Sequence, residues 1–191
     1  QGSVIDLDVD QALSLNAGIS TTTTAGIVRL AAASISQLLD SGSEILTQGL
    51  QLISRVGDLR LENTQNSVTT LAARAAAGAS YTNLGNLQID TVSGVQGITA
   101  ATDITLRSVE GDLTLLQALD ADQTAGVITL QALQGGVQSG NAAISADALR
   151  LVAAQSSDLS HAGNQLNRVA VRLSQTHADF ELVNQSGFTL D

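Results

Sequence analysis

Three acidic residues at alternating positions, Asp6, Asp8 and Asp10, are the side chains of this chain best placed to do chemistry. In an extended strand they would share one face, about 7 Å apart. Such a row suits a bound cation or the acid and base of a hydrolase. The plainer interpretation is the solvated face of a strand, which the simple alternation of the segment favours. Asp120 and Asp122 form a second, smaller cluster of this kind.

Other candidates for chemistry are sparse. His161 and His177 stand 16 residues apart (177 − 161) with no further His at ligand spacing, so both are expected on the surface. The chain has no Cys, which excludes disulfides and thiolate metal sites. The glycine-rich calcium nonapeptide of some repeat proteins is also missing. The sequence therefore predicts no catalytic residue, no cofactor or cofactor-binding residue, and no metal ligand.

Several charged residues recur about 100 positions later, and a unique active site would not recur. These pairs are Asp58 and Asp158, Asp90 and Asp191, and Arg74 and Arg172. The acids adjoin turn residues and are interpreted as corner residues. The arginines are expected to pair with an acid on a neighbouring coil.

The threonine-rich run at 20–24 resembles one rung of an ice-binding face, but residues 120–124 do not repeat it.

The composition fits one aliphatic domain of narrow bore. Hydrophobic residues make up 43% of the 191 residues, whereas aromatic residues make up only 2%. The net charge of −10 repels nucleic acid and anionic lipid. No apolar stretch is long enough to insert into a membrane. Neither nucleic acid nor the membrane interior is therefore an expected partner.

The chain repeats itself at long range. TAGIVRL at 24–30 returns as TAGVITL at 124–130, 100 positions later (124 − 24). Further matches join 49–53 to 148–152, 71–74 to 169–172, Tyr81 to Phe180, and 87–90 to 188–191. The chain thus divides into copy one, about 1–96, and copy two, about 97–191, within one continuous domain.

Short alternating segments lie inside each copy, as in Ile5 to Val9 and 104–106, and Gly, Asp, Asn and Ser separate them. Period-two alternation predicts strands with one apolar face, and a recurrence near twenty residues predicts a solenoid. Val68 to Ala79 is the one segment with helical character, but its counterpart at 166–173 reads as a strand. We predict an all-β parallel β-helix of about ten coils, a rod of roughly 50 Å.

Three phrases, Gly-Asp-Leu-Thr-Leu at 111–115, Ala-Gly-Val-Ile-Thr-Leu at 125–130 and Gly-Asn-Leu-Gln-Ile at 85–89, resemble the β-strand repeats of filamentous-haemagglutinin-like bacterial exoproteins. This resemblance covers most of the chain. It implies a right-handed β-helix, secretion to the bacterial cell surface, and a role in attachment or in surface filaments. The secretion domain of that family carries Asn-Pro motifs, and this chain has no Pro, so the resemblance points to a shaft segment.

The expected function is therefore structural: a non-enzymatic shaft segment of a secreted adhesin or extracellular filament. Strand patterns run to both ends, so the expected partners are neighbouring coils, either of one longer chain or of an identical molecule stacked head to tail. A host receptor or glycan is a further possible partner. The alternative from another class is a carbohydrate-active β-helix enzyme, a polysaccharide lyase or hydrolase, which would need convergent acids on one wet face.

Overall fold

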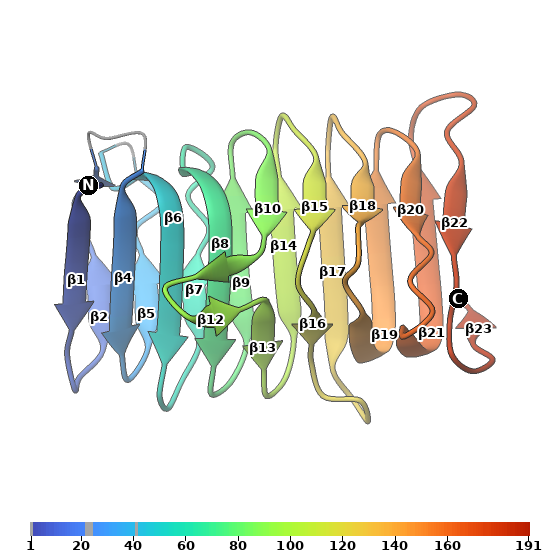
Figure 1. Cartoon of the computed structure of the whole chain (residues 1–191), viewed down its shortest axis with the longest axis horizontal. Coiled ribbons are helices and arrows are strands. Elements are labelled where there is room, and N and C mark those ends of the chain that lie inside the picture. The colour runs from blue at the N-terminus through green and yellow to red at the C-terminus, as the bar shows by residue number, and fades with distance from the viewer. Residues whose placement is uncertain (1, 22–24, 41) are drawn as a thin grey trace.

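The structure is a computed structural model that describes residues 2–21, 25–40 and 42–191. Within these ranges the chain is all-β, with 23 strands, and no segment forms a membrane-spanning helix. Parallel strands stack along the length of the molecule from β1 to β23 (Figure 1). The predicted parallel β-solenoid is confirmed.

Strands of successive turns form three ladders. Ladder A contains β1 (Val4–Asp8), β4 (Ile27–Ala32), the second halves of β6 (Ile45–Ser54) and β8 (Ser67–Ala75), β13 (Ile98–Ala100), β16 (Leu119–Asp120), and the first halves of β19 (Ile144–Ala153) and β21 (Gln165–Leu173). Ladder B contains β2 (Leu13–Leu15), β5 (Ile35–Gln37), β7 (Leu59–Leu61), β9 (Ala79–Asn83), β14 (Ile104–Ser108), β17 (Val127–Ala132), the second halves of β19 and β21, and β23 (Thr189–Leu190). Ladder C contains β3 (Ile19–Ser20), the first halves of β6 and β8, β15 (Leu113–Leu115), β18 (Val137–Ser139), β20 (Ser157–Leu159) and β22 (Phe180–Leu182). β10 (Leu87–Ile89) links two ladders, because it pairs with the second half of β8 in ladder A and with β15 in ladder C.

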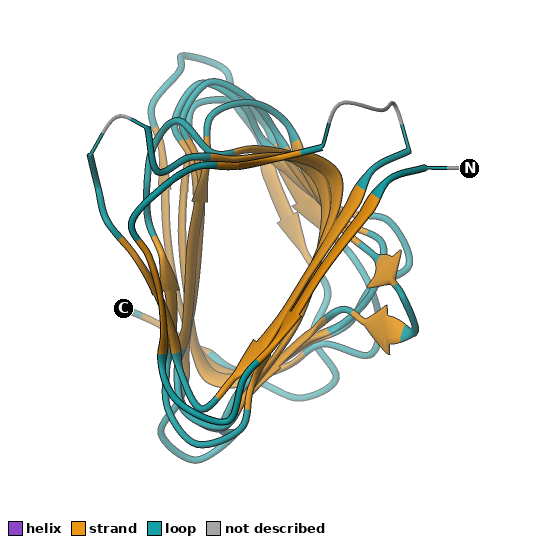
Figure 2. Cartoon of the chain, turned by 90° about the vertical axis from the view of Figure 1, so that its left-hand side faces the viewer, coloured by secondary structure: helices purple, strands orange, loops and turns teal. Residues whose placement is uncertain are grey.

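The three ladders enclose a roughly triangular cross-section (Figure 2). Seen from the N-terminal end, the chain turns clockwise as it recedes from the viewer, so the solenoid is right-handed. The segment with helical character forms β8 and the start of β9, because most residues of β8 pair with a neighbouring turn. Strand pairing across turns overrides the helix preference of its alanines.

The solenoid has about eight turns, fewer than the ten predicted. Along ladder B, Leu59 pairs with Ala79 and Ala79 pairs with Ile104, so these turns take 20 residues (79 − 59) and 25 residues (104 − 79). In sequence, Leu87 and Ile104 resemble one position on successive coils, but Leu87 pairs with Leu113 of ladder C, whereas Ile104 pairs with Ala79 of ladder B. Eight turns at about 4.8 Å each give a rod of about 38 Å.

The interior consists of aliphatic side chains stacked turn upon turn. Val28, Leu50, Leu71 and Ile89 are successive rungs of one stack, and each is at most 1% exposed. Close stacking of like side chains fills the bore at the density of a protein interior. Tyr81 is the one aromatic residue in this core, and burial raises its pKa well above the usual value.

The two copies have the same order of strands, and most matching strands have the same length. Strands β1 to β10 correspond to β14 to β23, from the five-residue β1 and β14 to the ten-residue β6 and β19. The registers refine one match: Leu59 pairs with Ala79 and its counterpart Ser157 pairs with Phe180, so Phe180 corresponds to Ala79 and not to Tyr81.

Corresponding strands nevertheless lie on different faces. β4 belongs to ladder A, whereas its counterpart β17 belongs to ladder B. From β4, four steps along ladder A lead through β6, β8 and β13 to β16, and β17 is the next strand on the following face. One copy therefore spans four turns and one further face.

A hairpin separates the copies. β11 (Thr91–Val92) and β12 (Val95–Gln96) pair antiparallel around Ser93 and Gly94, whose φ values of 50° and 86° match the tight turn of a two-residue hairpin. It projects outside the triangular section and lies against the outer side of ladder A (Figures 1 and 2). Gly97 ends it at φ 62°, where a Cβ would approach the Ala118 carbonyl oxygen to 2.2 Å, so only glycine fits there without a backbone shift.

Candidate functional site: the outer surface of the coils

The acidic strand face lies on β1, in the first turn. Asp6 stands beside Arg29 in register and forms an ion pair with it. Asp8 accepts a 2.5 Å hydrogen bond from Arg55, and Asp10 is exposed. Two of the three carboxylates therefore neutralise arginines of the next turns, which supports the solvated-strand interpretation over a cation or catalytic cluster.

The second acidic cluster belongs to a turn. Asp122 accepts 2.7 Å hydrogen bonds from the backbone N–H and the hydroxyl of Thr124, and these bonds lower the pKa of Asp122. Asp120 points outward from β16 and is exposed. Asp122 thus stabilises the turn after β16, a role that Asp residues commonly take.

Of the two recurring acids, Asp58 is a corner residue, as predicted. The corner prediction is wrong for Asp158, which lies within β20 and pairs in register with Gln138 and Glu181. Asp58 accepts a 3.0 Å bond from the Gly78 N–H of the next turn, and Asp158 accepts a 2.8 Å bond from the Ser160 N–H. The bond from Gly78, aided by Arg60, lowers the pKa of Asp58, and the hydroxyl and N–H of Ser160 lower the pKa of Asp158.

The prediction for Arg74 and Arg172 is wrong. Neither forms an ion pair among the residues that the structure describes. Arg74 lies between Ile53 and Thr99 in register, and Arg172 lies beside Val152, so no acid occupies the adjacent rungs.

The two histidines lie in separate turns, His161 after β20 and His177 after β21. His177 is exposed, as predicted, and His161 is half-buried in a turn, where its Nδ1 accepts a 3.1 Å bond from the Gly163 N–H. The described residues contain no group of three potential metal ligands. That no metal or cofactor binds stays a prediction.

Residues 22–24 of the threonine-rich run lie outside the described residues, so the ice-binding interpretation has no structural account.

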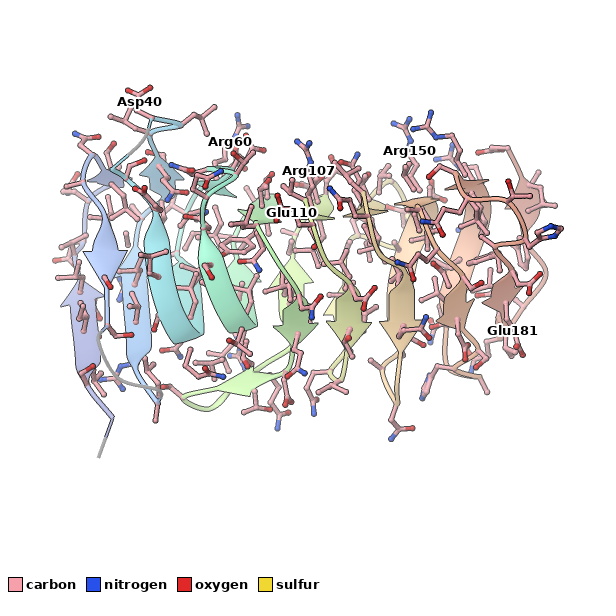
Figure 3. The ribbon with its side chains drawn as sticks, turned by 90° about the horizontal axis from the view of Figure 1, so that it is seen from above. Asp40, Arg60, Arg107, Glu110, Arg150 and Glu181 are labelled. Carbon is pink, nitrogen blue, oxygen red and sulfur yellow. The ribbon has the colours of Figure 1, made fainter. Side chains whose placement is uncertain are left out.

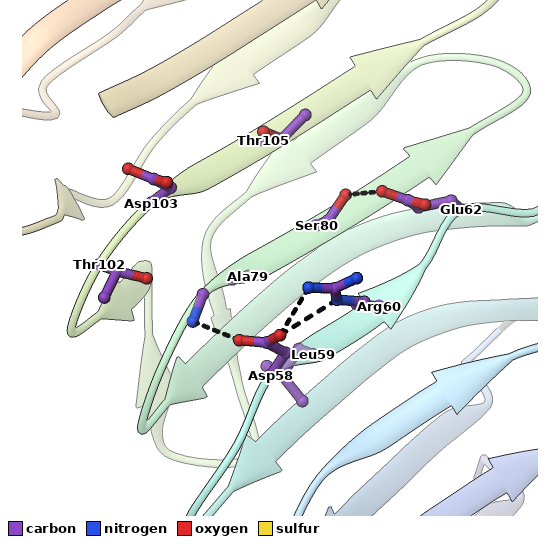
Figure 4. Close-up of a pocket in the computed structure, with 10 residues that line it drawn as sticks. Asp58, Leu59, Arg60, Glu62, Ala79, Ser80, Thr102, Asp103 and Thr105 are labelled. Carbon is purple, nitrogen blue, oxygen red and sulfur yellow. Dashed lines mark hydrogen bonds and ion pairs between the residues drawn. The ribbon is translucent and has the colours of Figure 1, made fainter. Parts of the chain in front are cut away.

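Two shallow grooves indent the outer side of ladder B. The first holds about 250 Å³ and is lined by polar groups of β7, β9 and β14, including Asp58, Arg60, Glu62, Ser80 and Asp103 (Figure 4). Arg60 donates to Asp58 at 2.8 Å, and Ser80 bonds Glu62. Most of its polar groups are therefore satisfied by their neighbours, which leaves few free to act on a substrate.

General acid catalysis at neutral pH needs a carboxyl whose pKa is raised. Every carboxyl with a shifted pKa in the described residues is shifted downward: Asp58, Asp122, Asp147 and Asp158. These shifts arise from backbone N–H groups, hydroxyls and arginines that stabilise the ionised form. They are typical of carboxylates that hold turns and ion pairs.

The lowered pKa of Asp58 predicts a pH-dependent contribution to stability. Because the folded state holds the pKa of Asp58 below its ordinary value of 3.8, Asp58 stabilises the fold above that pH, and the contribution is lost as pH falls through the lowered pKa. The side chain is 38% exposed, so solvent screening keeps the effect small. Urea unfolding of the wild type and Asp58→Asn should differ at neutral pH, and the difference should shrink as pH falls through the lowered pKa; a difference that does not change with pH would contradict this assignment.

The second groove holds about 370 Å³ and lies over β17, β19 and β21. Gln131, Arg150, Val152, Ala170 and Arg172 line it, with Asp191 at its edge. No continuous stretch of the sequence indicates this basic surface, because its arginines are far apart in the chain. Figure 3 shows Arg60, Arg107 and Arg150 projecting along one side of the rod.

Comparisons with known proteins identify no relative of this chain: no family model, curated protein or solved structure matches it.

Proposed function

We propose that this chain is a structural shaft segment of a secreted, cell-surface bacterial adhesin or extracellular filament. One observation carries the proposal: parallel ladders run unbroken through both copies, past the hairpin that separates them. A rod in which each turn is hydrogen-bonded to the next is long and stiff, as a shaft segment needs to be. The bacterial surface as its location rests on the resemblance of the strand phrases to filamentous-haemagglutinin-like repeats.

The terminal turns support coils as partners. Leu7 in the first turn is 38% exposed, whereas its counterpart Leu106 inside the rod is 1% exposed. Leu190 in the last turn is 76% exposed, whereas its counterpart Ile89 is 0% exposed. The same positions are therefore buried wherever another turn covers them. We propose neighbouring coils, of the same or an identical chain, as the partners at both ends.

Surface display provides the test. An antibody raised against the 191 residues should label intact cells that produce the native protein, and external protease should remove the label. Labelling that requires permeabilised cells would overturn the proposed location. Electron microscopy of the labelled cells should place the antibody on fibres.

The second candidate function is that of an enzyme, because three carboxylates, Asp58, Glu62 and Asp103, line the first groove. We expect no turnover of acidic or neutral polysaccharides. Product formation that Asp103→Asn or Glu62→Gln abolishes, while the exposed Asp10→Asn leaves it unchanged, would overturn the structural proposal in favour of a β-helix lyase or hydrolase.

A further inference from the structure

The hairpin at the junction of the copies covers a defined apolar surface of copy one. Val92 and Val95 are 4% and 5% exposed and pack on Ala72, which is 0% exposed. Ile27 and Ile53 border this contact. All three covered residues point outward from β4, β6 and β8, so the hairpin buries an outer face and not the bore.

Copy two presents the corresponding surface without a hairpin. The counterparts of Ile27, Ile53 and Ala72 are Val127, Val152 and Ala170 on β17, β19 and β21. All three are small or branched apolar residues, and none of them is fully buried. The second groove runs across this surface and is lined by Val152 and Ala170. The alanine that the hairpin buries in copy one is thus accessible in copy two, whereas the two bordering residues are half-buried in both copies.

Charge distinguishes the two surfaces. In copy one, the outer rows contain Asp6 and Asp8, which pair with Arg29 and Arg55. In copy two, Thr105 stands at the position of Asp6 and Arg107 at the position of Asp8. Arg150 stands at the position of Gln51.

Arg150 and Arg172 line the groove over the apolar face of copy two, with Asp191 at its edge, and Arg107 lies one rung away beside Gln131. None of these arginines forms an ion pair among the described residues. On a chain of net charge −10, this surface is a local concentration of unpaired positive charge. It favours an occupant that carries carboxylates, because guanidinium and carboxylate form strong paired hydrogen bonds.

Shape also distinguishes the two surfaces. A Cβ on Gly49 would stand 3.3 Å from Val92 Cγ1, which is tighter than ordinary packing. Copy two has Ala148 at this position, in register with Val127 as Gly49 is with Ile27. The methyl group of Ala148 takes space that Val92 uses in copy one. An occupant of copy two therefore needs a smaller residue there, so the hairpin of an identical molecule is a poor fit.

We propose that the outer face of β17, β19 and β21 is a docking site for a short β-hairpin of another protein. The hairpin it fits carries one small residue and one valine on its inner side and carboxylates at its flanks. The apolar pair covers Val127, Val152 and Ala170, and the carboxylates meet Arg150 and Arg172. Aromatic side chains, on which nucleic-acid bases or neutral sugars would stack, are missing from the residues that line the groove.

Two cyclic peptides test the site, each closed by a disulfide between added terminal cysteines and labelled with a fluorophore. The acidic hairpin has the sequence Glu-Ala-Ser-Gly-Val-Glu. The matched hairpin, Thr-Val-Ser-Gly-Val-Gln, copies residues 91–96. Fluorescence anisotropy with the 191-residue chain as titrant should show the acidic hairpin binding at least about tenfold more tightly, in the weak range of small interfaces.

Variants of the chain assign the contacts. Arg150→Gln should remove most of the preference for the acidic hairpin, whereas Arg74→Gln, which removes the same charge from ladder A, should leave it unchanged. Ala148→Gly, which restores the glycine of copy one, should raise the affinity for the matched hairpin.

Three results would overturn the proposal. The first is equal affinity of the two hairpins for the wild-type chain, and the second is no binding of either. The third is undiminished binding of an acidic hairpin whose alanine and valine are both replaced by serine, because that would reveal a basic surface without an apolar site.

Discussion

Asn66→Ala is expected to lower the free energy of unfolding by about 3 kcal/mol. The Asn66 side chain is 0% exposed and connects three successive turns. Its Oδ1 accepts from the Ile45 N–H at 2.9 Å and from the Gln37 amide at 2.8 Å, and its Nδ2 donates to the Thr82 carbonyl oxygen at 3.2 Å. Alanine leaves these buried groups without partners, and each unsatisfied group costs about 1–3 kcal/mol, partly offset by relaxation.

Urea unfolding followed by circular dichroism measures this loss. Asn16→Ala is the matched control, because Asn16 is exposed and only accepts a bond from Ser14; a change below about 0.5 kcal/mol is expected. Asn164, the counterpart of Asn66, bonds Ile144, Leu159 and Val183 but has no partner like Gln37, so Asn164→Ala should cost less than Asn66→Ala. A loss below about 1 kcal/mol for Asn66→Ala would contradict the role of this amide as a bond between turns.

End-to-end association of the isolated 191 residues is the second large effect that we expect. Inside the rod, β9 of copy one pairs with β14 of copy two, with Ala79 opposite Ile104. Their counterparts at the two ends are Phe180 on β22 and Ile5 on β1. Unpaired strand edges readily accept another strand. One molecule should therefore add to the next through these edges, in a contact that does not close and so forms fibres.

Sedimentation velocity over a range of protein concentrations measures the association. Leu7→Arg should weaken it at least about tenfold, because an arginine replaces a leucine that the contact would bury. Val56→Arg is the control: Val56 is 75% exposed in a turn, away from both ends. The same register places Glu181 beside Asp6, so added salt should strengthen association by screening the two carboxylates. A wild-type chain that stays monomeric at high concentration would refute the expectation.

Local pattern was enough to predict the fold class. Period-two alternation and turn residues predicted parallel strands, and the strand-like counterpart at 166–173 correctly favoured a strand for Val68 to Ala79. The number of turns was beyond local pattern, because Leu87 and Ile104 have the same kind of sequence on different faces. A sequence repeat fixes which residues are equivalent, but only strand pairing fixes the face on which each one lies.

The surface was harder to predict than the core. A core position needs only to be apolar, whereas an ion pair needs a partner at one particular neighbouring rung. Arg29 has Asp6 beside it, but Arg74 has Ile53 and Thr99, and the sequence spacing of the recurring arginines contains no information about these neighbours. Residues 91–96 adjoin the predicted boundary of the copies, but nothing in their sequence indicates which face the hairpin covers.

The extra face in each copy sets the direction in which surface features point. Corresponding residues such as Arg29 and Thr129 lie on adjacent sides of the rod, about 120° apart around its axis. In a tandem array of such copies, equivalent sites would wind around the fibre as a spiral, and the same azimuth would return only after three copies, or 13 turns (3 × 4⅓). A fibre of this kind would present each copy's surface in three directions, so a flat target on any side would meet one copy in three.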